Sequence, residues 1–271
     1  MKNTTEQRFG ICGAPITQSL SPKLFKAAYP HRRYSYELLP TSDPTEAIDL
    51  FLKKELSGMN VTAPLKTAIL PLVHRQTPEC ESIGACNMVL KQDNLLVAHN
   101  VDCIGVSNSI SEAKVPLKHT PCLLLGAGGA AKAAAFALIE AGASLSWANR
   151  TPERIPCTFL DGAVAAFSLA EAAPLLQTCI VIINTLPQST PETERFRFHP
   201  WHVILDASYT SRPFARQASM AGATYIGGER WLFHQAIPSF ASMTGASPNV
   251  QAMEKVLDSQ IIFRAPKNFV H

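Results

Sequence analysis

The stretch from Cys122 to Arg150 constrains the fold of this 271-residue chain more than any other. A short apolar run leads into Gly126, Gly128 and Gly129, and an alanine-rich segment with helical propensity and a second apolar run follow. This is the order strand, tight turn, helix, strand. Glycines in such a turn let the backbone approach a pyrophosphate, and the helix N-terminus adds free N–H groups and a positive dipole. The stretch therefore predicts a dinucleotide-binding βαβ unit.

The end of the second apolar run indicates which dinucleotide is bound. A site for NAD normally carries Asp or Glu about 20 residues beyond the glycines, where it binds the ribose 2′-hydroxyl. This chain instead has Asn149 and Arg150, with Arg154 one turn further on. A guanidinium pairs with a 2′-phosphate through charge-assisted hydrogen bonds, so the predicted cofactor is NADP. A glycine-rich loop without a ligand is the alternative, which the strand, the helix and the basic pair together make less favoured.

Composition and charge exclude several classes of protein. Apolar residues make up 46% of the chain and charged residues 17%, as in a globular protein. The net charge of +3 is small and its basic residues are dispersed, so we expect neither nucleic-acid nor membrane-surface binding. No apolar run is long enough to span a membrane, and the first ten residues lack the apolar core of a signal peptide. The expected location is the cytoplasm.

Cysteine and histidine spacing argues against disulfides and metal sites. The seven cysteines are odd in number, form no C-x-x-C pair and lie mostly in apolar stretches, so we expect buried free thiols in a reducing compartment. The eight histidines show no spacing typical of zinc ligands, and we predict no metal site.

Strand and helix patterns alternate along the whole chain. The first hundred or so residues read as an α/β unit of their own, in which a strand at 58–62 stops before Pro64 and Lys66 lies in the first turn of the next helix. A hairpin is expected at 87–92 and 95–99, and a helix at 102–113 leads to the nucleotide unit. Residues 157–160 are predicted as a strand, 187–196 as a mobile loop and 249–263 as a helix. The fold class is thus α/β, with two domains and a cleft between them.

Three polar clusters in the first domain interrupt apolar sequence at the ends of elements. They are Ser19 and Ser21; Asn60, Thr62 and Lys66; and Asn87 with Asp102. A lysine beside an aspartate can donate a proton to a carbonyl oxygen as a hydride arrives, and accept it in the reverse reaction. Taken singly, each residue also has a structural interpretation: Ser21 as a helix cap, Asn87 in a turn, Lys66 as a solvated surface side chain.

Seven motifs, in order and spacing, resemble those of the shikimate dehydrogenase family and cover nearly the whole chain. They are SLSP, GMNVTAPLK, IGACN, HNVD, GAGGAAKA, NRTPER and WLFHQAIPSFASMTG. The combination of NVTxPxK, GAGGA and NRT in one chain is highly specific. The resemblance implies reversible reduction of 3-dehydroshikimate to shikimate by NADPH, in aromatic amino-acid biosynthesis.

Residue roles follow from the resemblance by position. Lys66 and Asp102 are implied as the catalytic pair, with Lys66 as the proton carrier. The implied substrate ligands are Ser19, Ser21 and Tyr209 for the carboxylate, and Asn60, Thr62, Asn87 and Gln235 for the ring hydroxyls. The implied cofactor ligands are Gly126, Gly128, Gly129 and Ala130 at the pyrophosphate, and Asn149, Arg150, Thr151 and Arg154 at the 2′-phosphate. The expected domains are a substrate-binding and catalytic domain of residues 1–103 and 236–271 and a Rossmann-like NADP-binding domain of residues 104–235.

Several positions depart from the family pattern. Val101 and Cys103 flank the aspartate where Thr and Gly are usual, the segment NTLPQST replaces Asn-Ala-Thr, and Trp231 replaces a methionine. Trp231 either crowds the nicotinamide or fills core, and core is favoured. A paralogue acting on quinate, or a non-catalytic relative that binds NADPH or shikimate, are the alternatives. We expect a small-molecule substrate and a monomer or homodimer.

Overall fold

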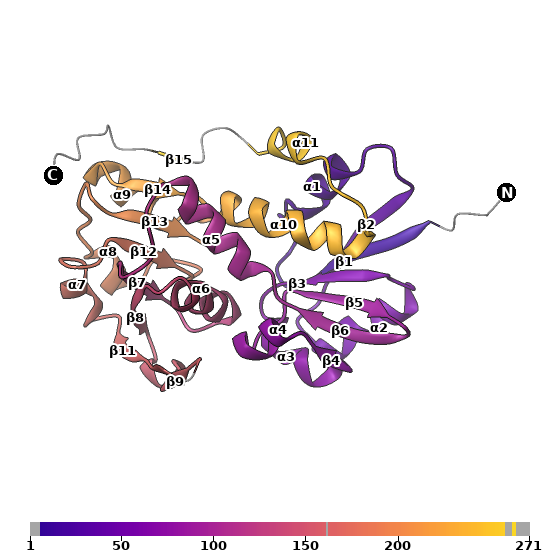
Figure 1. The fold of residues 1–271 in the computed structure, drawn as a ribbon, viewed down its shortest axis with the longest axis horizontal. Coiled ribbons are helices and arrows are strands. Elements are labelled where there is room, and N and C mark those ends of the chain that lie inside the picture. Colours follow the sequence, from indigo (N-terminus) through magenta and orange to yellow (C-terminus); the bar gives the residue numbers. More distant parts are fainter. Residues whose placement is uncertain (1–5, 161, 258–261, 264–271) are drawn as a thin grey trace. The chain divides into compact units, whose positions relative to one another are not determined.

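The computed structural model describes residues 6–160, 162–257 and 262–263, which fall into two compact α/β units (Figure 1). In the described chain, the first unit runs to Asp102 and resumes with Gln235–Leu257, and the second unit comprises Cys103–His234 together with residues 262–263. Helix α5 (Asp102–Glu112) begins at one change of unit, and helix α10 (Gly228–Thr244) contains the other. The predicted α/β fold class is confirmed.

A mixed six-stranded sheet, with strand order β2-β1-β3-β5-β6-β4, forms the centre of the first unit. Its strands are β1 (Gln7–Gly13), β2 (Tyr34–Pro40), β3 (Gly58–Val61), β4 (Arg75–Gln76), β5 (Met88–Gln92) and β6 (Leu95–His99). Strands β1, β2 and β3 are parallel, and β5 forms the predicted antiparallel hairpin with β6 while also pairing antiparallel with β3. The carboxyl ends of β1, β3 and β6 and the start of β5 therefore share one edge.

Short helices cover this sheet. They are α1 (Ser21–Ala28), α2 (Pro44–Lys53), α3 (Leu65–Ala68), the 3₁₀ turn η1 (Leu70–Leu72) and α4 (Pro78–Ile83). Asp43 caps α2 as its position suggests, because its carboxylate accepts a hydrogen bond from Thr45 N at 2.8 Å. Phe51, Met59 and Leu65 are fully or almost fully buried in a common cluster, so α2 and α3 pack on the sheet through apolar contacts.

Aromatic packing ties the late segment Gln235–Leu257 to the first unit. The ring of Phe240 lies 5.0 Å from that of Phe25, which stacks on Tyr36 at 4.6 Å. Helix α11 (Val250–Glu254) packs near α1, and Asn249 N donates to Ala28 O at 2.9 Å just before it. The first unit is thus built from two separate stretches of the chain.

A seven-stranded sheet with order β11-β8-β7-β12-β13-β14-β15 forms the second unit. Its strands are β7 (Pro121–Leu125), β8 (Ser144–Asn149), β11 (Ala165–Ser168), β12 (Val181–Asn184), β13 (Val203–Asp206), β14 (Thr224–Ile226) and β15 (Ile262–Phe263). The first six are parallel, in the 3-2-1-4-5-6 order of a doubly wound dinucleotide-binding fold. The predicted βαβ unit is its centre, with α6 (Gly129–Glu140) between β7 and β8. The remaining helices are η2 (Pro152–Arg154), α7 (Ala172–Leu175), α8 (Pro191–Glu194) and α9 (Ala215–Ala221).

The strand predicted at 157–160 is present as the shorter β9 (Thr158–Phe159), which pairs with β10 (Gly162–Ala163) in a small separate sheet. Two other local predictions are wrong. The segment 187–196 contains α8, whose start is fixed by a capping box at Thr190. The helix predicted at 249–263 stops at Glu254, and β15 pairs antiparallel with β14, so this strand lies in the second unit rather than in the predicted substrate domain. Ile and Phe favour such pairing. Residues 258–261 lie outside the described chain.

An ionic cluster joins α5 and α10 inside the second unit. Arg230 Nε donates to Glu112 Oε2 at 2.8 Å, a second guanidinium nitrogen contacts Glu112 Oε1, and His234 Nε2 lies 2.9 Å from the same oxygen. Burial on its own raises the pKa of Glu112, but the hydrogen bonds and charges of His234 and Arg230 outweigh this and lower it to about 2. The carboxylate is therefore ionised throughout the physiological range.

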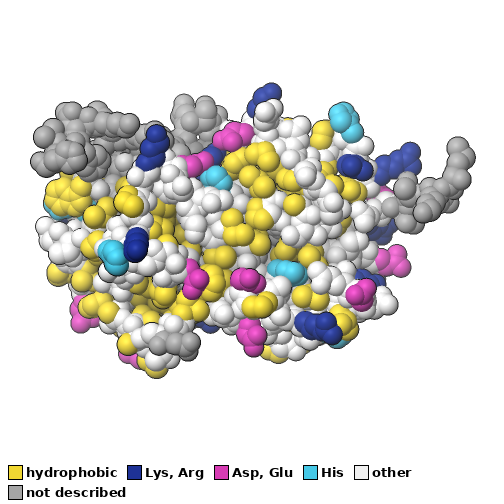
Figure 2. Space-filling model, viewed as in Figure 1, with side chains coloured by type: hydrophobic (Ala, Val, Ile, Leu, Met, Phe, Trp, Pro, Cys, Tyr) yellow, Lys and Arg dark blue, Asp and Glu magenta, His cyan; other side chains and the backbone are white. Residues whose placement is uncertain are grey.

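Surface chemistry agrees with the modest net charge. On the face shown in Figure 2, Lys and Arg side chains lie singly among polar and apolar ones. No helix in the described part of the chain is long and apolar enough to cross a membrane. All seven cysteines are free thiols, and six of them are buried, as predicted; Cys157 is exposed.

Candidate active site

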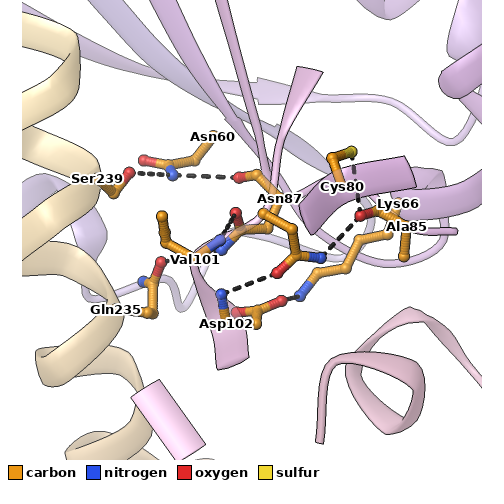
Figure 3. A network of polar contacts seen from close by, with 10 residues as sticks. Asn60, Lys66, Cys80, Ala85, Asn87, Val101, Asp102, Gln235 and Ser239 are labelled. Carbon is orange, nitrogen blue, oxygen red and sulfur yellow. Dashed lines mark hydrogen bonds and ion pairs between the residues drawn. The ribbon is translucent and has the colours of Figure 1, made fainter. Parts of the chain in front are cut away.

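Lys66 and Asp102 form an ion pair at the polar edge of the first sheet (Figure 3). Lys66 Nζ contacts Asp102 Oδ2, and the two side chains are only 15% and 7% exposed. Removing two charges from water is costly, and this penalty offsets most of the attraction between them. A nearly buried ion pair such as this one therefore adds little to the stability of the fold. A lysine that is held by a carboxylate and still partly accessible is suited to transferring a proton to a ligand.

Neighbouring strand ends bring the two residues together. Strand β3 ends at Val61, and Leu65 N donates to Thr62 O at 2.9 Å, which turns the chain into α3 with Lys66 in its first turn. Strand β6 ends at His99, three residues before Asp102 starts α5. Because β5 lies between β3 and β6, residues far apart in sequence meet at this edge. The motifs GMNVTAPLK, IGACN and HNVD are therefore neighbours in space, as the sequence interpretation requires.

Buried amides surround this pair. Asn87 Oδ1 accepts from Val101 N at 2.9 Å, and Asn87 Nδ2 donates to Gln235 Oε1 at 3.3 Å. The structure thus brings Gln235 beside Asn87 although 148 residues separate them. Gln235 accepts through its oxygen here, so its NH₂ group is the end that remains for a ligand.

Asn60 is held more completely by the protein. Its Nδ2 donates to Ser239 Oγ at 2.7 Å and to Asn87 O at 3.2 Å, and its Oδ1 accepts from Tyr36 OH at 2.7 Å. Both N–H donors of the amide are therefore used internally. Sequence reasoning missed Tyr36 and Ser239. Ser239 lies four residues after Gln235 on α10, so the helical spacing could have indicated it.

The other predicted substrate ligands of the first unit lie after β1 and β3. Ser19 Oγ accepts from Ser21 N at 3.3 Å, and α1 has no side-chain cap, so Ser21 is not the helix cap. Thr62 N donates to Cys12 O at 2.9 Å, which aligns the ends of β3 and β1. Gly13 (φ +152°) passes so close to Thr62 that a Cβ would lie 2.4 Å from Thr62 Cγ2. A glycine is required there.

The glycine turn of the second unit fits a dinucleotide pyrophosphate. Gly126 has φ +105°, and a Cβ there would lie 2.3 Å from Thr185 Oγ1, so only glycine fits. Gly128 is the N-cap of α6, and a Cβ there would meet nothing within 4 Å. The first turn of α6, with Gly129 and Ala130, therefore begins beside open space, where its free N–H groups can bind an anion. Trp147, which sequence reasoning missed, holds the turn by donating to Gly126 O at 2.5 Å.

The residues that are predicted to bind the 2′-phosphate lie at the end of strand β8 and in the loop after it. Asn149 is 8% exposed and donates from Nδ2 to Thr151 O at 2.8 Å, which shapes the loop into η2. Arg150 and Arg154 are exposed. Neither guanidinium forms an ion pair with a carboxylate of residues 6–160 or 162–257. Both charges are available to a phosphate.

Tyr209 belongs to the second unit, whereas Ser19 and Ser21, its predicted companions at the carboxylate, belong to the first. It follows β13 in a loop that packs tightly on α10: a Cβ at Gly228 would lie 2.8 Å from Tyr209 N. Trp231 is 4% exposed, which agrees with the favoured interpretation as a core residue.

Buried Asp206 anchors the same loop at the end of β13. Asn184 Nδ2 and Tyr225 OH each donate to it at 2.8 Å. Burial raises the pKa of Asp206, and these donors oppose that change.

Comparisons with known proteins agree on one family. A family model described as the shikimate dehydrogenase substrate binding domain matches residues 11–89. The chain is 32% identical to a shikimate dehydrogenase (NADP(+)) of Halorubrum lacusprofundi, over 93% of this chain and 98% of the relative. It is 34% identical to one of Thermus thermophilus, over 92% and 96%. The crystal structure of the Thermus thermophilus shikimate 5-dehydrogenase with NADP(H) and shikimate is 29% identical, covers 92% of this chain and 98% of that one, and has a TM-score of 0.77.

Proposed function

This chain belongs to the shikimate dehydrogenase family, and on that premise we propose that it catalyses the reversible, NADPH-dependent reduction of 3-dehydroshikimate to shikimate in aromatic amino-acid biosynthesis. The observation that carries the proposal is the Lys66–Asp102 ion pair. A protein that only bound its ligands would have little need for a proton carrier beside a carboxylate in a nearly buried position.

Lys66 is the proton carrier of the proposed reaction. When bound, NADPH supplies a hydride to the carbonyl carbon. The Lys66 ammonium donates a proton to the carbonyl oxygen as negative charge develops there, and in the reverse direction the amine accepts it. Asp102 orients the ammonium group through its direct contact and balances its charge. The carboxylate oxygen that does not contact Lys66 is free to accept a hydrogen bond from a ring hydroxyl.

The substrate ring is bound by the polar groups around this pair. Thr62 supplies a hydroxyl, and Gln235 supplies the NH₂ group that its contact with Asn87 leaves free. Asn87 also keeps one N–H for a ligand, since its two other polar contacts go to the protein. Asn60 contributes to the ring site mainly by holding Ser239 and Asn87 in place. Ser19 and Ser21 bind the substrate carboxylate, with Tyr209 as the ligand from the second unit.

NADP is bound by the second unit. Gly126, Gly128, Gly129 and Ala130 form the turn and helix start at the pyrophosphate, and Asn149, Arg150, Thr151 and Arg154 form the loop at the 2′-phosphate. The close approach at Gly126, the open space at Gly128 and the exposed guanidinium groups of Arg150 and Arg154 support this assignment. We infer a substrate-binding and catalytic domain in the first unit and an NADP-binding domain in the second.

A substrate profile tests the proposal. The purified chain is incubated with shikimate or quinate and with NADP⁺ or NAD⁺, and the reduced cofactor is followed by its near-ultraviolet absorbance. We expect turnover with shikimate and NADP⁺ to exceed that with the other three combinations. Faster turnover of quinate would instead identify a quinate-directed paralogue. No turnover with any combination, in a protein that binds NADPH, would identify a non-catalytic binding relative.

We also infer that the enzyme works in the cytoplasm as a monomer or homodimer. Six buried free thiols are compatible with a reducing compartment. Chemical cross-linking and size-exclusion chromatography distinguish the two assembly states.

A further inference from the structure

We propose that Asn100 is a positioning residue for the reaction and that the segment Ala85–Asn87 sets the separation of Lys66 and Asp102. This inference rests on the proposed function, because it concerns how the two catalytic groups are kept in contact. Asn100 is 5% exposed and lies two residues before Asp102. It does not itself take up or release a proton.

The side chain of Asn100 joins two backbone segments. Its Oδ1 accepts from Asp102 N at 2.9 Å, and its Nδ2 donates to Ala85 O at 2.7 Å. Asp102 N is one of the N–H groups at the start of α5 that have no partner within the helix. The side-chain oxygen of Asn100 therefore supplies an acceptor for this N–H group, and its NH₂ group fixes the start of α5 against Ala85.

The adjacent residue fixes the other catalytic group. Cys86 N donates to Lys66 O at 2.6 Å. The main chain of Lys66 is therefore bound to Cys86, the residue directly after Ala85, to which Asn100 is bound. The contacts form a closed ring that runs from the Lys66 main chain through Cys86, Ala85, Asn100 and Asp102 and returns through the ion pair to Lys66 Nζ. Figure 3 shows Lys66, Ala85 and Asp102 of this ring.

Asn87 provides a second hydrogen bond between the segment Ala85–Asn87 and the start of α5. Its Oδ1 accepts from Val101 N at 2.9 Å, so two successive N–H groups at the start of α5 are bound by side-chain amides. The segment Ala85–Asn87 is itself rigid, since Ala85, Cys86 and Asn87 are at most 3% exposed. Such a template limits how far the carboxylate can move from the ammonium, and a misplacement of about 1 Å can cost a factor of 10² in rate.

Asn100→Ala tests this role. It removes the acceptor for Asp102 N and the donor to Ala85 O. We expect kcat to fall about 10- to 100-fold, with the KM values for shikimate and NADP⁺ changed by less than about threefold. The solvent deuterium isotope effect on kcat should rise, because proton transfer becomes slower while hydride transfer is unaffected. Asn100→Ser keeps an acceptor within reach of Asp102 N and should recover part of kcat.

Ser109→Ala is the matched control. Ser109 is fully buried on α5 and donates to Gly105 O at 2.7 Å, so its loss removes one buried hydrogen bond from the same helix. We expect a similar loss of thermal stability with normal kcat and isotope effect. If Asn100→Ala is folded and keeps kcat within twofold of the wild type, or if the control loses kcat equally, the proposal is wrong. If Asn100→Ala does not fold, the same criteria apply to Asn100→Ser.

A structural measurement separates this proposal from the proposed function. Wild-type protein that fails to oxidise shikimate refutes the proposed function alone. Crystal structures of wild type and Asn100→Ala then still decide the positioning role: a longer or broken contact between Lys66 Nζ and Asp102 in the variant supports it, and an unchanged contact overturns it.

Discussion

Neutralising Glu112 should destabilise the second unit by an amount that depends on pH. The pKa of this carboxyl is lowered from its ordinary 4.5 to about 2 in the folded protein. At about 1.4 kcal/mol for each pH unit, the difference corresponds to roughly 3 kcal/mol of folding stability. The Glu112 side chain is 25% exposed, and solvent screening reduces the figure, so we expect Glu112→Gln to cost about 2 to 3 kcal/mol at neutral pH.

The sign of the pH dependence follows from the direction of the pKa change. A carboxyl with a lowered pKa in the folded state contributes its stability above the unfolded value, and loses it as pH falls through the folded value. The difference between wild type and Glu112→Gln should therefore be full above about pH 4.5 and shrink toward about pH 2. The substitution also removes the carboxylate that Arg230, whose side chain is 10% exposed, contacts in the wild type.

Tryptophan fluorescence is a suitable assay because all three tryptophans, Trp147, Trp201 and Trp231, lie in the second unit. Urea unfolding is followed at several pH values for wild type, Glu112→Gln and the control Glu153→Gln, which removes an exposed carboxylate of the same unit. The control should leave the transition midpoint unchanged. A loss below about 1 kcal/mol for Glu112→Gln at neutral pH, or one that does not shrink in acid, would refute the reasoning.

The remaining predictions concern the proposed reaction and its cofactor. Lys66→Ala should lower kcat by about two to four orders of magnitude with nearly unchanged substrate affinity, and a large loss of affinity at unchanged kcat would mean that Lys66 only binds substrate. Arg150→Ala should weaken NADPH binding, measured by calorimetry, far more than NADH binding, and equal weakening would contradict the 2′-phosphate assignment. Gly126→Ala should abolish NADPH binding, because the new Cβ would lie 2.3 Å from Thr185 Oγ1. Gly128→Ala, whose Cβ meets no protein atom within 4 Å, should leave the fold intact while still weakening NADPH by crowding the pyrophosphate; normal binding by both variants would exclude the turn as the cofactor site.

The parts of the fold that could be predicted are those with strong local patterns. The glycine turn between β7 and α6 and the hairpin of β5 and β6 appear where apolar periodicity and turn residues indicate them. Helix α4 was missed although Thr77, Pro78 and Gly84 carry its start and stop signals, because six residues are too few to show a helical period. Strands β4 and β10 have two residues each, which is too few to show an alternating pattern.

The candidate site divides in the same way. Lys66, Asp102 and Asn87 could be proposed because they interrupt apolar sequence at element ends, and the structure brings them together. Tyr36 could not, because only the tertiary fold creates its contact with Asn60. The helical spacing from Gln235 points to Ser239, but its contact with Asn60 is likewise set by the fold. The full use of the Asn60 donors by the protein is likewise a property of packing and not of any motif.

The discontinuous first unit imposes an order on biosynthesis. Asn60 and Asn87 are translated early, but Gln235 and Ser239, which bind their buried amides, are translated only after residues Cys103–His234 of the second unit. Domains of nascent chains generally fold from the N-terminus as they are made. Here the second unit can form its sheet through β14 before α10, which the first unit needs, has been translated. A ribosome that stalls before Gln235 would release a chain that contains Lys66, Asp102 and the glycine turn but lacks the α10 partners of Asn60 and Asn87.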